Sequence, residues 1–240
     1  MDTVKVSWSG GKDSTAAALL HLRAGHKVHM VCFIPFLSDG IPAIRKDHYE
    51  HIMRCKERFE QLGACVHITS GKTYEYHTHR IKRRGEKAGK FMGTGLGFGF
   101  CLFRNYSKIR DGLDKVRIDC DYKDIGIAAD ETKRQNQLNN MKRSILLDHG
   151  LSELDAYRLC ERERMLSPIY RRSGRDGCAF CPNAKTEEFL LWLNDYPEAA
   201  PKLEHIELFC KTVTPDHAPY RGRQWFTDRM KYGFIQLSFT

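Results

Sequence analysis

The sequence has no apolar run near the roughly 20 residues that a membrane-spanning helix requires. Its first residues, MDTVKVSWSGG, also lack the long apolar core of a secretion signal. Internal repeats and low-complexity segments are missing as well, and a composition of 41% hydrophobic and 29% charged residues is ordinary for a folded globular protein. We therefore expect a cytoplasmic protein with no membrane partner.

Acidic residues are in the minority, because 39 Lys and Arg face 30 Asp and Glu and give a net charge of +9. Such an excess favours an anionic partner, which can be a nucleotide, a sulfated or phosphorylated substrate, or a nucleic acid. Charge alone does not choose among these classes. The length of 240 residues is enough to bury a core and allows one α/β domain with an appendage or two small domains.

Apolar patterning along the chain alternates between strands and helices. Short apolar runs predict strands at 4–8, 27–34, 65–69 and 124–129, and helical spacing predicts helices at 15–24, 47–62, 152–165 and 186–196. This order predicts an α/β fold with a mostly parallel, doubly wound sheet, whose ligands bind beyond the carboxyl ends of the strands. We expect a nucleotide-binding domain at 1–150 and a smaller, helical, cysteine-bearing region at 151–240.

A glycine turn joins the first predicted strand to the first helix, in the order Ser9, Gly10, Gly11, Lys12, Asp13, Ser14. Backbone amides and the positive end of the helix can hold a phosphate there. The two glycines let the backbone approach closely, Lys12 adds a positive charge, and Asp13 can cap the helix or help to hold Mg²⁺. The spacing is not that of the loop that grips the β and γ phosphates in kinases and GTPases. A glycine turn with a capping side chain is the alternative.

Between 74 and 104 regular periodicity fails, and a run of His, Arg and Lys from His77 to Lys90 is followed by glycines at 93, 95, 97 and 99. A long stretch of this kind is often a substrate lid. We expect a mobile basic loop over a bound ligand, with a solvated basic surface as the alternative.

The hexapeptide after an N-terminal strand resembles the PP-loop of the adenine nucleotide α-hydrolase superfamily. Further segments are similar to its phosphoadenosine phosphosulfate reductase-like branch, including the phage and bacterial members. These segments are Cys101 followed by Lys108-Ile109; Ile125 to Glu131 with Arg134; and Ser167-Pro168-Ile169-Tyr170 leading to Gly177-Cys178-Ala179-Phe180-Cys181-Pro182. We use the name PP-loop for residues Ser9 to Ser14.

The resemblance implies an enzyme that binds ATP at the PP-loop and releases pyrophosphate while it adenylates a substrate. It implies that Asp130 and Glu131 lie beside the nucleotide with Mg²⁺, and that Lys12, Asp13, Lys108 and Arg134 act on the reacting phosphates. Reductases of this branch end in a Cys-containing motif, whereas no cysteine follows Cys210 here. We therefore expect no sulfonucleotide reduction by that route.

Nine cysteines are an odd number, and Cys178 and Cys181 form one tight pair. In a reducing compartment such a pair indicates metal or redox chemistry. By resemblance to the iron-sulfur reductases, the expected metal ligands are Cys101, Cys160, Cys178 and Cys181, with Cys120 as an alternative to Cys160. Four thiolates suit a [4Fe-4S] cluster or Zn²⁺. If Cys160 is instead a core residue, the other three leave an open iron that can carry sulfide.

The main hypothesis is an ATP-dependent enzyme that activates its substrate for sulfur transfer, with sulfur from the metal site or from an outside donor. A second hypothesis keeps the fold and takes a sulfonucleotide as ligand. A third is a nucleic-acid-associated protein with a structural metal, in which the basic stretch holds a phosphate backbone. A nucleic acid can also be the substrate that is modified.

We predict that anaerobically purified protein absorbs broadly near the blue end of the visible spectrum and contains iron and acid-labile sulfide. Cys178→Ala should lose all of these, because one thiolate of the cluster is removed. Metal and sulfide analysis with a visible spectrum checks this. A colourless protein with stoichiometric zinc would make the cysteine region structural.

Overall fold

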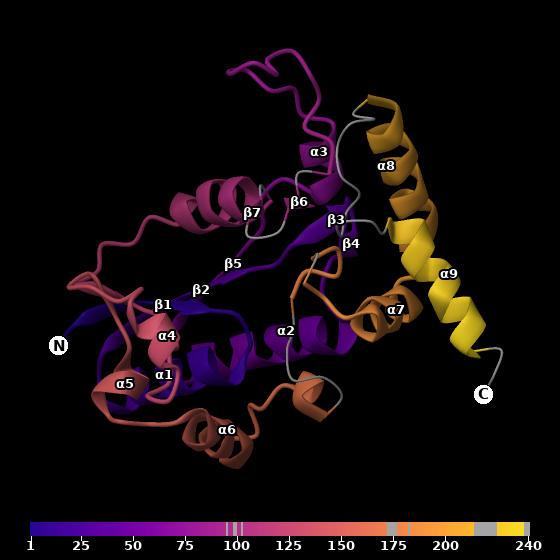
Figure 1. The fold of residues 1–240 in the computed structure, drawn as a ribbon. Coiled ribbons are helices and arrows are strands. Elements are labelled where there is room, and N and C mark those ends of the chain that lie inside the picture. The colour runs from indigo at the N-terminus through magenta and orange to yellow at the C-terminus, as the bar shows by residue number, and fades with distance from the viewer. Residues whose placement is uncertain are drawn as a thin grey trace. The chain divides into compact units, whose positions relative to one another are not determined.

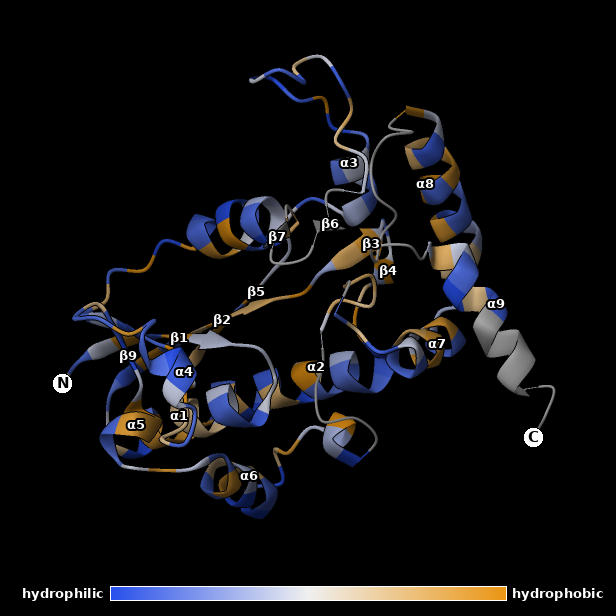
Figure 2. Cartoon of the chain, viewed as in Figure 1, coloured by the Kyte–Doolittle hydropathy of each residue, from blue (hydrophilic) through white to orange (hydrophobic). Residues whose placement is uncertain are grey.

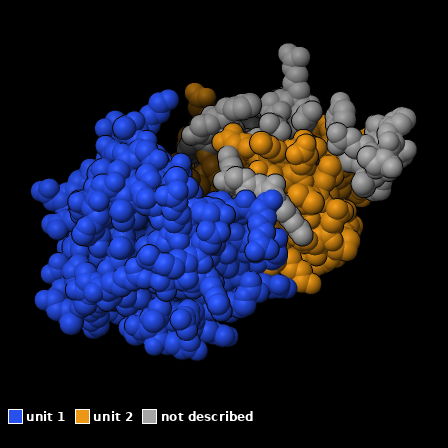
Figure 3. Space-filling model, turned by 90° about the horizontal axis from the view of Figure 1, so that it is seen from below, with its two compact units in different colours: residues 1–33, 47–69, 113–176 blue, residues 34–46, 70–112, 177–240 orange. Residues whose placement is uncertain are grey.

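The computed structural model describes residues 1–94, 96–97, 100–101, 103–171, 177–181, 183–213 and 225–237, with backbone alone at 96–97, 100 and 232–237. The chain divides into two compact units, which Figure 3 shows in different colours. Unit 1 comprises Met1–Phe33, Asp47–Thr69 and Leu113–Asp176, and unit 2 comprises Ile34–Lys46, Ser70–Gly112 and Gly177–Thr240.

Unit 1 is an α/β structure built on a parallel sheet (Figure 1). In the described chain this sheet has five strands in the order β5-β2-β1-β8-β9, and each neighbouring pair is parallel. The strands are β1 (Thr3–Trp8), β2 (Lys27–Phe33), β5 (Cys65–Thr69), β8 (Tyr122–Asp124) and β9 (Lys142–Arg143). The apolar character of β2 is visible in Figure 2.

Two helices lie below this sheet in the view of Figure 1, α1 (Lys12–Arg23) and α2 (Lys46–Gln61). Helix α1 is rich in Ala and Leu, which have high helix propensity. The buried residues of α2 recur at helical spacing and include Ile52 and Phe59. Phe59 packs edge-on against Trp8 of β1, with ring centroids 5.6 Å apart. This packing fixes α2 against the sheet.

The rest of unit 1 covers the start of α1 or packs along its side. Helices α5 and α6 contact α1. Ser152 caps α6: its hydroxyl accepts the amide of Asp155 at 3.2 Å, and the carboxylate of Asp155 accepts the amide of Ser152 at 2.9 Å. The elements are η2 (Leu113–Lys115), α4 (Thr132–Gln135), α5 (Ile145–Asp148), α6 (Glu153–Arg162) and η3 (Pro168–Arg171).

Unit 2 is mainly helical, and aromatic side chains form much of its core. Tyr74 stacks on Phe180 with ring centroids 4.3 Å apart, and Phe103 meets Phe180 edge-on at 4.9 Å. The elements are β3 (Phe36–Ser38), β4 (Ile41–Pro42), α3 (Tyr74–Thr78), β6 (Leu96–Gly97), β7 (Phe100–Cys101), the π-helical η1 (Arg104–Gly112), α7 (Thr186–Asp195), α8 (Ala199–Val213) and α9 (Phe226–Leu237).

Most of the expected elements are present within a residue or three of their predicted bounds, but the strand predicted at 124–129 is wrong. The strand there, β8, ends at Asp124. The segment that follows crosses the start of α1 at Gly126, while the amide of Ile125 still donates to the carbonyl of Arg143 in β9 at 3.0 Å and Ile127 bonds to the hydroxyl of Ser144.

The two units do not follow the expected division at residue 150. Helix α6 belongs to unit 1 because it packs on α1, and residues 34–46 and 70–112 belong to unit 2. The stretch from 74 to 104 also holds more regular structure than expected. Helix α3 begins it, and Ile81 and Phe91 then form an antiparallel bridge. We call residues 80–92 the basic hairpin. Glycines 95 and 99 lie outside the described residues.

None of the described helices combines the length and the apolarity that crossing a membrane would need.

We predict that Phe59→Ala lowers the free energy of unfolding by about 3 to 5 kcal/mol, because it empties a fully buried site under the sheet. Leu62→Ala is the matched control. Its side chain is 45% exposed, so the change should stay within about 0.5 kcal/mol. Urea titration followed by circular dichroism measures both, and equal losses would contradict this account of the core.

Candidate functional site

The PP-loop begins with a backbone turn that only glycine fits. Gly10 has φ +75°, a left-handed conformation that is strained for other residues. A Cβ atom there would lie 2.6 Å from Cγ1 of Ile52 and 2.9 Å from Cε1 of His48. The chain can therefore turn from β1 into α1 only with the bare backbone of glycine pressed against α2.

His48 holds this turn through a hydrogen bond to its backbone. Its Nε2 donates to the carbonyl oxygen of Ser9 at 3.1 Å, since a carbonyl can only accept. Its Nδ1 lies 2.8 Å from the hydroxyl of Ser167. The ring is buried, so both nitrogens are used inside the protein. The segment before η3 and the PP-loop are linked through one imidazole.

His51 lies one turn further along α2, and the backbone of Gly10 acts on its pKa. Burial lowers the pKa of His51 to about 4, with smaller contributions from His48 and Arg54. Its Nε2 is 3.4 Å from the sulfur of Cys55. His51 is therefore neutral at pH 7, and it contributes no charge to the PP-loop.

Helix α1 starts without a side-chain cap among the described residues. Its first amide, that of Lys12, donates to the hydroxyl of Tyr170 at 2.9 Å. The hydroxyls of Ser9 and Ser14 lie 3.3 Å apart, and Ser14 also donates to the carbonyl of Gly11 at 3.2 Å. A helix start lined by amides and hydroxyls is a suitable place for an anion.

The segment from Ile125 to Glu131 crosses directly over this helix start. A Cβ atom on Gly126 would lie 2.6 Å from the backbone carbon of Asp13 and from the nitrogen of Ser14. The amide of Ala129 donates to the carbonyl of Leu151 at 2.8 Å. These contacts bring the two motifs of unit 1 that resemble the PP-loop superfamily together.

Two cations and three carboxylates meet at this crossing. The ammonium of Lys12 bonds to Asp13 and to Glu153, each at 2.8 Å. Oxygen atoms of Asp13, Glu131 and Glu153 all lie within 4.8 Å of one another. Arg134 pairs with Glu131 at 2.6 Å. The group forms a compact charged cluster beside the PP-loop, which we call the acidic cluster for Asp13, Glu131 and Glu153.

The electrostatics of the acidic cluster shift two pKa values. Burial raises the pKa of Asp13, the hydrogen bond from Lys12 opposes this rise, and Glu131 and Glu153 add to it. For Lys12, burial acts to lower the pKa, but hydrogen bonds to Asp13 and Glu153 outweigh it and the pKa is raised. Lys12 is therefore firmly cationic, while the carboxylates repel one another.

Three of the four expected metal ligands, Cys101, Cys178 and Cys181, belong to unit 2. Phe180 sits between the paired cysteines and packs on Phe103, two residues after Cys101. Burial raises the pKa of Cys101, the amide of Arg104 opposes the rise with a hydrogen bond to its sulfur at 3.3 Å, and Cys181 adds to it. Cys101 and Cys181 therefore interact electrostatically, but Cys101, Cys178 and Cys181 are not among the groups of described residues whose ligand atoms lie within 4.8 Å of one another.

The paired cysteines lie on a tight turn. The amide of Cys181 donates to the carbonyl of Cys178 at 2.7 Å, and the amide of Ala179 donates to the carbonyl of Ala43 at 2.8 Å. Pro182, the last residue of the quoted motif, lies outside the described residues.

Cys160, the fourth expected ligand, lies in α6 of unit 1. It is fully buried, and its thiol donates to the carbonyl of Lys12 at 3.2 Å. Burial raises the pKa of this thiol to about 12, with further contributions from Asp13 and Cys55. The bond requires the protonated thiol. Cys120 also lies in unit 1, where it is partly exposed and near Lys5.

Of the remaining expected site residues, Asp130 accepts the amide of Glu153 at 3.0 Å and so anchors the start of α6. Lys108 is exposed on η1 in unit 2. Our sequence reasoning did not single out His48, His51 or Glu153. The sequence gives a weak indication for Glu153, because Glu153 is the first residue of a helix whose cap can be predicted. It gives none for the two histidines, because more than 30 residues separate them from the PP-loop.

A scan against protein-family models and a search of curated proteins each found no match to this chain.

We predict that His51→Gln weakens the dependence of stability on pH. The pKa of His51 in the folded state is about 4, below its ordinary value of 6.5. Between pH 4 and pH 6.5 the unfolded chain therefore binds more protons than the folded chain. The stabilising contribution is present above pH 6.5 and is lost as pH falls toward 4. Between pH 7 and 4.5 the variant should lose about 2 kcal/mol less unfolding free energy than the wild type.

Urea titrations at both pH values measure this difference. His149→Gln, at an exposed histidine, is the control and should keep the wild-type slope. Burial also lowers the pKa of His77 in unit 2 to about 4. His77 is present in the wild type and in both variants, so it does not contribute to the difference between them. If the unfolding free energy of His51→Gln depended on pH as steeply as that of the wild type, the prediction would be contradicted.

Proposed function

We propose that this chain is a cytoplasmic PP-loop enzyme with a doubly wound sheet, and that it cleaves ATP between the α and β phosphates to adenylate a substrate for sulfur transfer. The observation that carries the proposal is the meeting of Lys12 and the acidic cluster at the start of α1. A lysine, a helix start and carboxylates suit a nucleotide bound together with a divalent cation.

In this proposal the phosphates of ATP lie against the backbone at Gly10 and Gly11 and against the hydroxyls of Ser9 and Ser14. An oxygen of the substrate attacks the α phosphorus, a P–O bond forms, and pyrophosphate leaves with the electron pair of the bond that breaks. Lys12 and Arg134 stabilise the negative charge that develops on the phosphate oxygens. Both cations are at present paired with carboxylates, and they exchange those partners for phosphate oxygens.

The acidic cluster fits Mg²⁺ by its chemistry. Its donors are carboxylate oxygens, which this ion prefers, and their mutual repulsion is relieved by a divalent cation. When bound, Mg²⁺ offsets the charge of the phosphates. Asp13, Glu131 and Glu153 hold it in this proposal, and Asp130 orients Glu153 through the amide that it accepts.

For the cysteine site, we propose Cys101, Cys178 and Cys181 as the ligands of a [4Fe-4S] cluster. Their soft thiolate donors suit it. The protonated, hydrogen-bonded thiol of Cys160 does not fit a ligand role, which favours the arrangement with three thiolates. A cluster of this kind supplies sulfur or electrons when bound. Structural Zn²⁺ is the alternative for the same cysteines.

A nucleic-acid substrate has one supporting observation, the basic hairpin. Arg83, Arg84, Lys87 and Lys90 are exposed on it, so they are available to a phosphate backbone. We therefore propose a nucleic acid as a candidate acceptor of the adenylate or of the sulfur.

We predict that Lys12→Ala weakens binding of Mg²⁺ with α,β-methylene ATP about 10- to 100-fold, because one charge-assisted hydrogen bond to phosphate is lost. Lys56→Ala removes the same charge from an exposed pair with Glu60 on α2 and should bind like the wild type. Calorimetric titration measures both. Equal affinities, or no binding by the wild type, would overturn the proposal, and tighter binding of phosphoadenosine phosphosulfate than of ATP would favour a sulfonucleotide ligand.

A further inference from the structure

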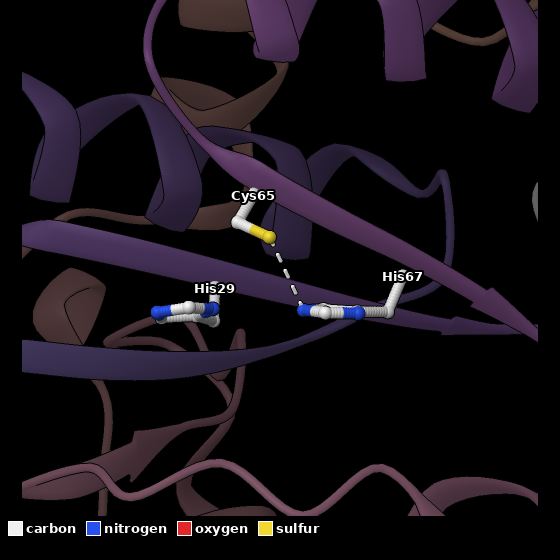
Figure 4. Close-up of side chains that lie close together, drawn as sticks. All are labelled: His29, Cys65 and His67. Carbon is white, nitrogen blue, oxygen red and sulfur yellow. Dashed lines mark hydrogen bonds between the residues drawn. The ribbon is translucent and has the colours of Figure 1, made fainter.

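Two histidines and a cysteine lie together on one face of the sheet in unit 1, away from the PP-loop residues (Figure 4). Strands β2 and β5 are parallel, with His29 directly opposite Cys65 and Val31 opposite His67. Side chains two residues apart on a strand point to the same face, so Cys65 and His67 share the face of His29. The regular pairing of two strands therefore positions all three side chains.

The ligand atoms of these residues are close enough to share one ion. One ligand atom from each lies within 4.8 Å of the other two. The sulfur of Cys65 is 3.3 Å from Nε2 of His67, and the rings of His29 and His67 stack with centroids 5.8 Å apart and an interplanar angle of 15°. In Figure 4 the sulfur of Cys65 points to the ring of His67, and the rings of His29 and His67 are seen edge-on and nearly parallel.

His29 has an unused donor or acceptor in this cluster. Its Nδ1 is buried and has no hydrogen-bond partner among the described residues. A buried polar atom without a partner is costly and calls for an explanation such as an ion or water.

We propose that His29, Cys65 and His67 form a binding site for a transition-metal ion of the Zn²⁺ class. Two imidazole nitrogens and one thiolate are donors that Zn²⁺ prefers and that Mg²⁺ does not. Zn–N bonds of about 2.0 Å and Zn–S bonds of about 2.3 Å place ligand atoms about 3.3 to 3.6 Å apart in a tetrahedron. The 3.3 Å between Cys65 and His67 already matches this spacing.

The site leaves a coordination position for solvent, because the described chain brings three ligands and Cys65 is exposed. On binding, the thiol of Cys65 gives its proton to water and its sulfur bonds to the ion. Two lysines lie beside His29 on this face. Lys27 lies two residues before His29 in β2 and is exposed. Lys5 lies opposite His29 in β1, and its ammonium donates to the carbonyl of Val116 at 2.7 Å.

Strand β5 is the last strand of the sheet order at that end, so a bound ion would tie the edge strand to β2. This site is separate from the acidic cluster and from the cysteines of unit 2, and it does not depend on nucleotide binding.

The first test is titration of the metal-free protein with Co²⁺, whose visible bands and sulfur-to-metal charge-transfer band report a tetrahedral thiolate site. The starting protein carries Cys101→Ser, Cys178→Ser and Cys181→Ser, so that the cysteines of unit 2 cannot give the signal. We expect one equivalent to bind. Cys65→Ser should abolish the charge-transfer band. His67→Ala should weaken Co²⁺ binding more than about tenfold, because even the loss of a group that only hydrogen-bonds to a metal ligand lowers metal affinity about tenfold.

Cys120→Ser and His149→Ala, which remove a thiol and an imidazole elsewhere in unit 1, are the matched controls and should keep the full spectrum. A charge-transfer band that persists in Cys65→Ser would overturn the proposal, as would a titration without such a band.

The second test uses the wild-type protein and does not depend on the folding of any variant. Zn²⁺ should slow alkylation of Cys65 by iodoacetamide, as read by peptide mass spectrometry, and EDTA should restore the rate. Mg²⁺ should have no effect, because thiolate and imidazole are poor ligands for it. An unchanged alkylation rate in the presence of Zn²⁺ would reject the site.

Discussion

At Gly10 the chain makes a left-handed turn against Ile52 and His48, with no room for a side chain. The rest of unit 1 depends on this close approach of backbone to helix. It sets where β1 ends and α1 begins, and α2 meets the turn because Phe59 packs against Trp8. The hydrogen bond from His48 to Ser9 then fixes the turn. A second close approach, at Gly126, presses another loop onto the start of α1 from outside.

The charges near the start of α1 have to be considered together, because each cation there is paired with a carboxylate. A nucleotide is a polyanion, and a site with three carboxylates would repel it unless cations compensate. Lys12 and Arg134 are present, but each is already shared with a carboxylate. The same arrangement favours the joint binding of phosphate and a divalent ion over the binding of either alone. Electrostatics of this kind couple two ligands without any movement of the fold.

Local features of the fold could be predicted from the sequence, because they depend on neighbours along the chain. The Ala- and Leu-rich α1 and the alternating β1 are examples, and so is the PP-loop between them. The segment at 125–129 could not, since Gly126 crosses the start of α1 and the regular strand ends at Asp124. Long-range contacts decided the rest. His48 reaches the PP-loop only after folding, and Cys160 packs under Lys12, although its spacing from other cysteines resembles that of a ligand.

The chain passes between the two units at five points, 33/34, 46/47, 69/70, 112/113 and 176/177. No continuous fragment therefore contains one unit without part of the other, and a cut at 46/47, 69/70 or 112/113 leaves both units incomplete. During synthesis β1, α1 and β2 emerge early, but β8 and α6, which complete their environment, follow after about a hundred residues of further translation. Until β8 and α6 have been synthesised, apolar surface of β1, α1 and β2 stays exposed. The exposure of apolar surface during translation is thus a consequence of how the chain is threaded, and not of its composition.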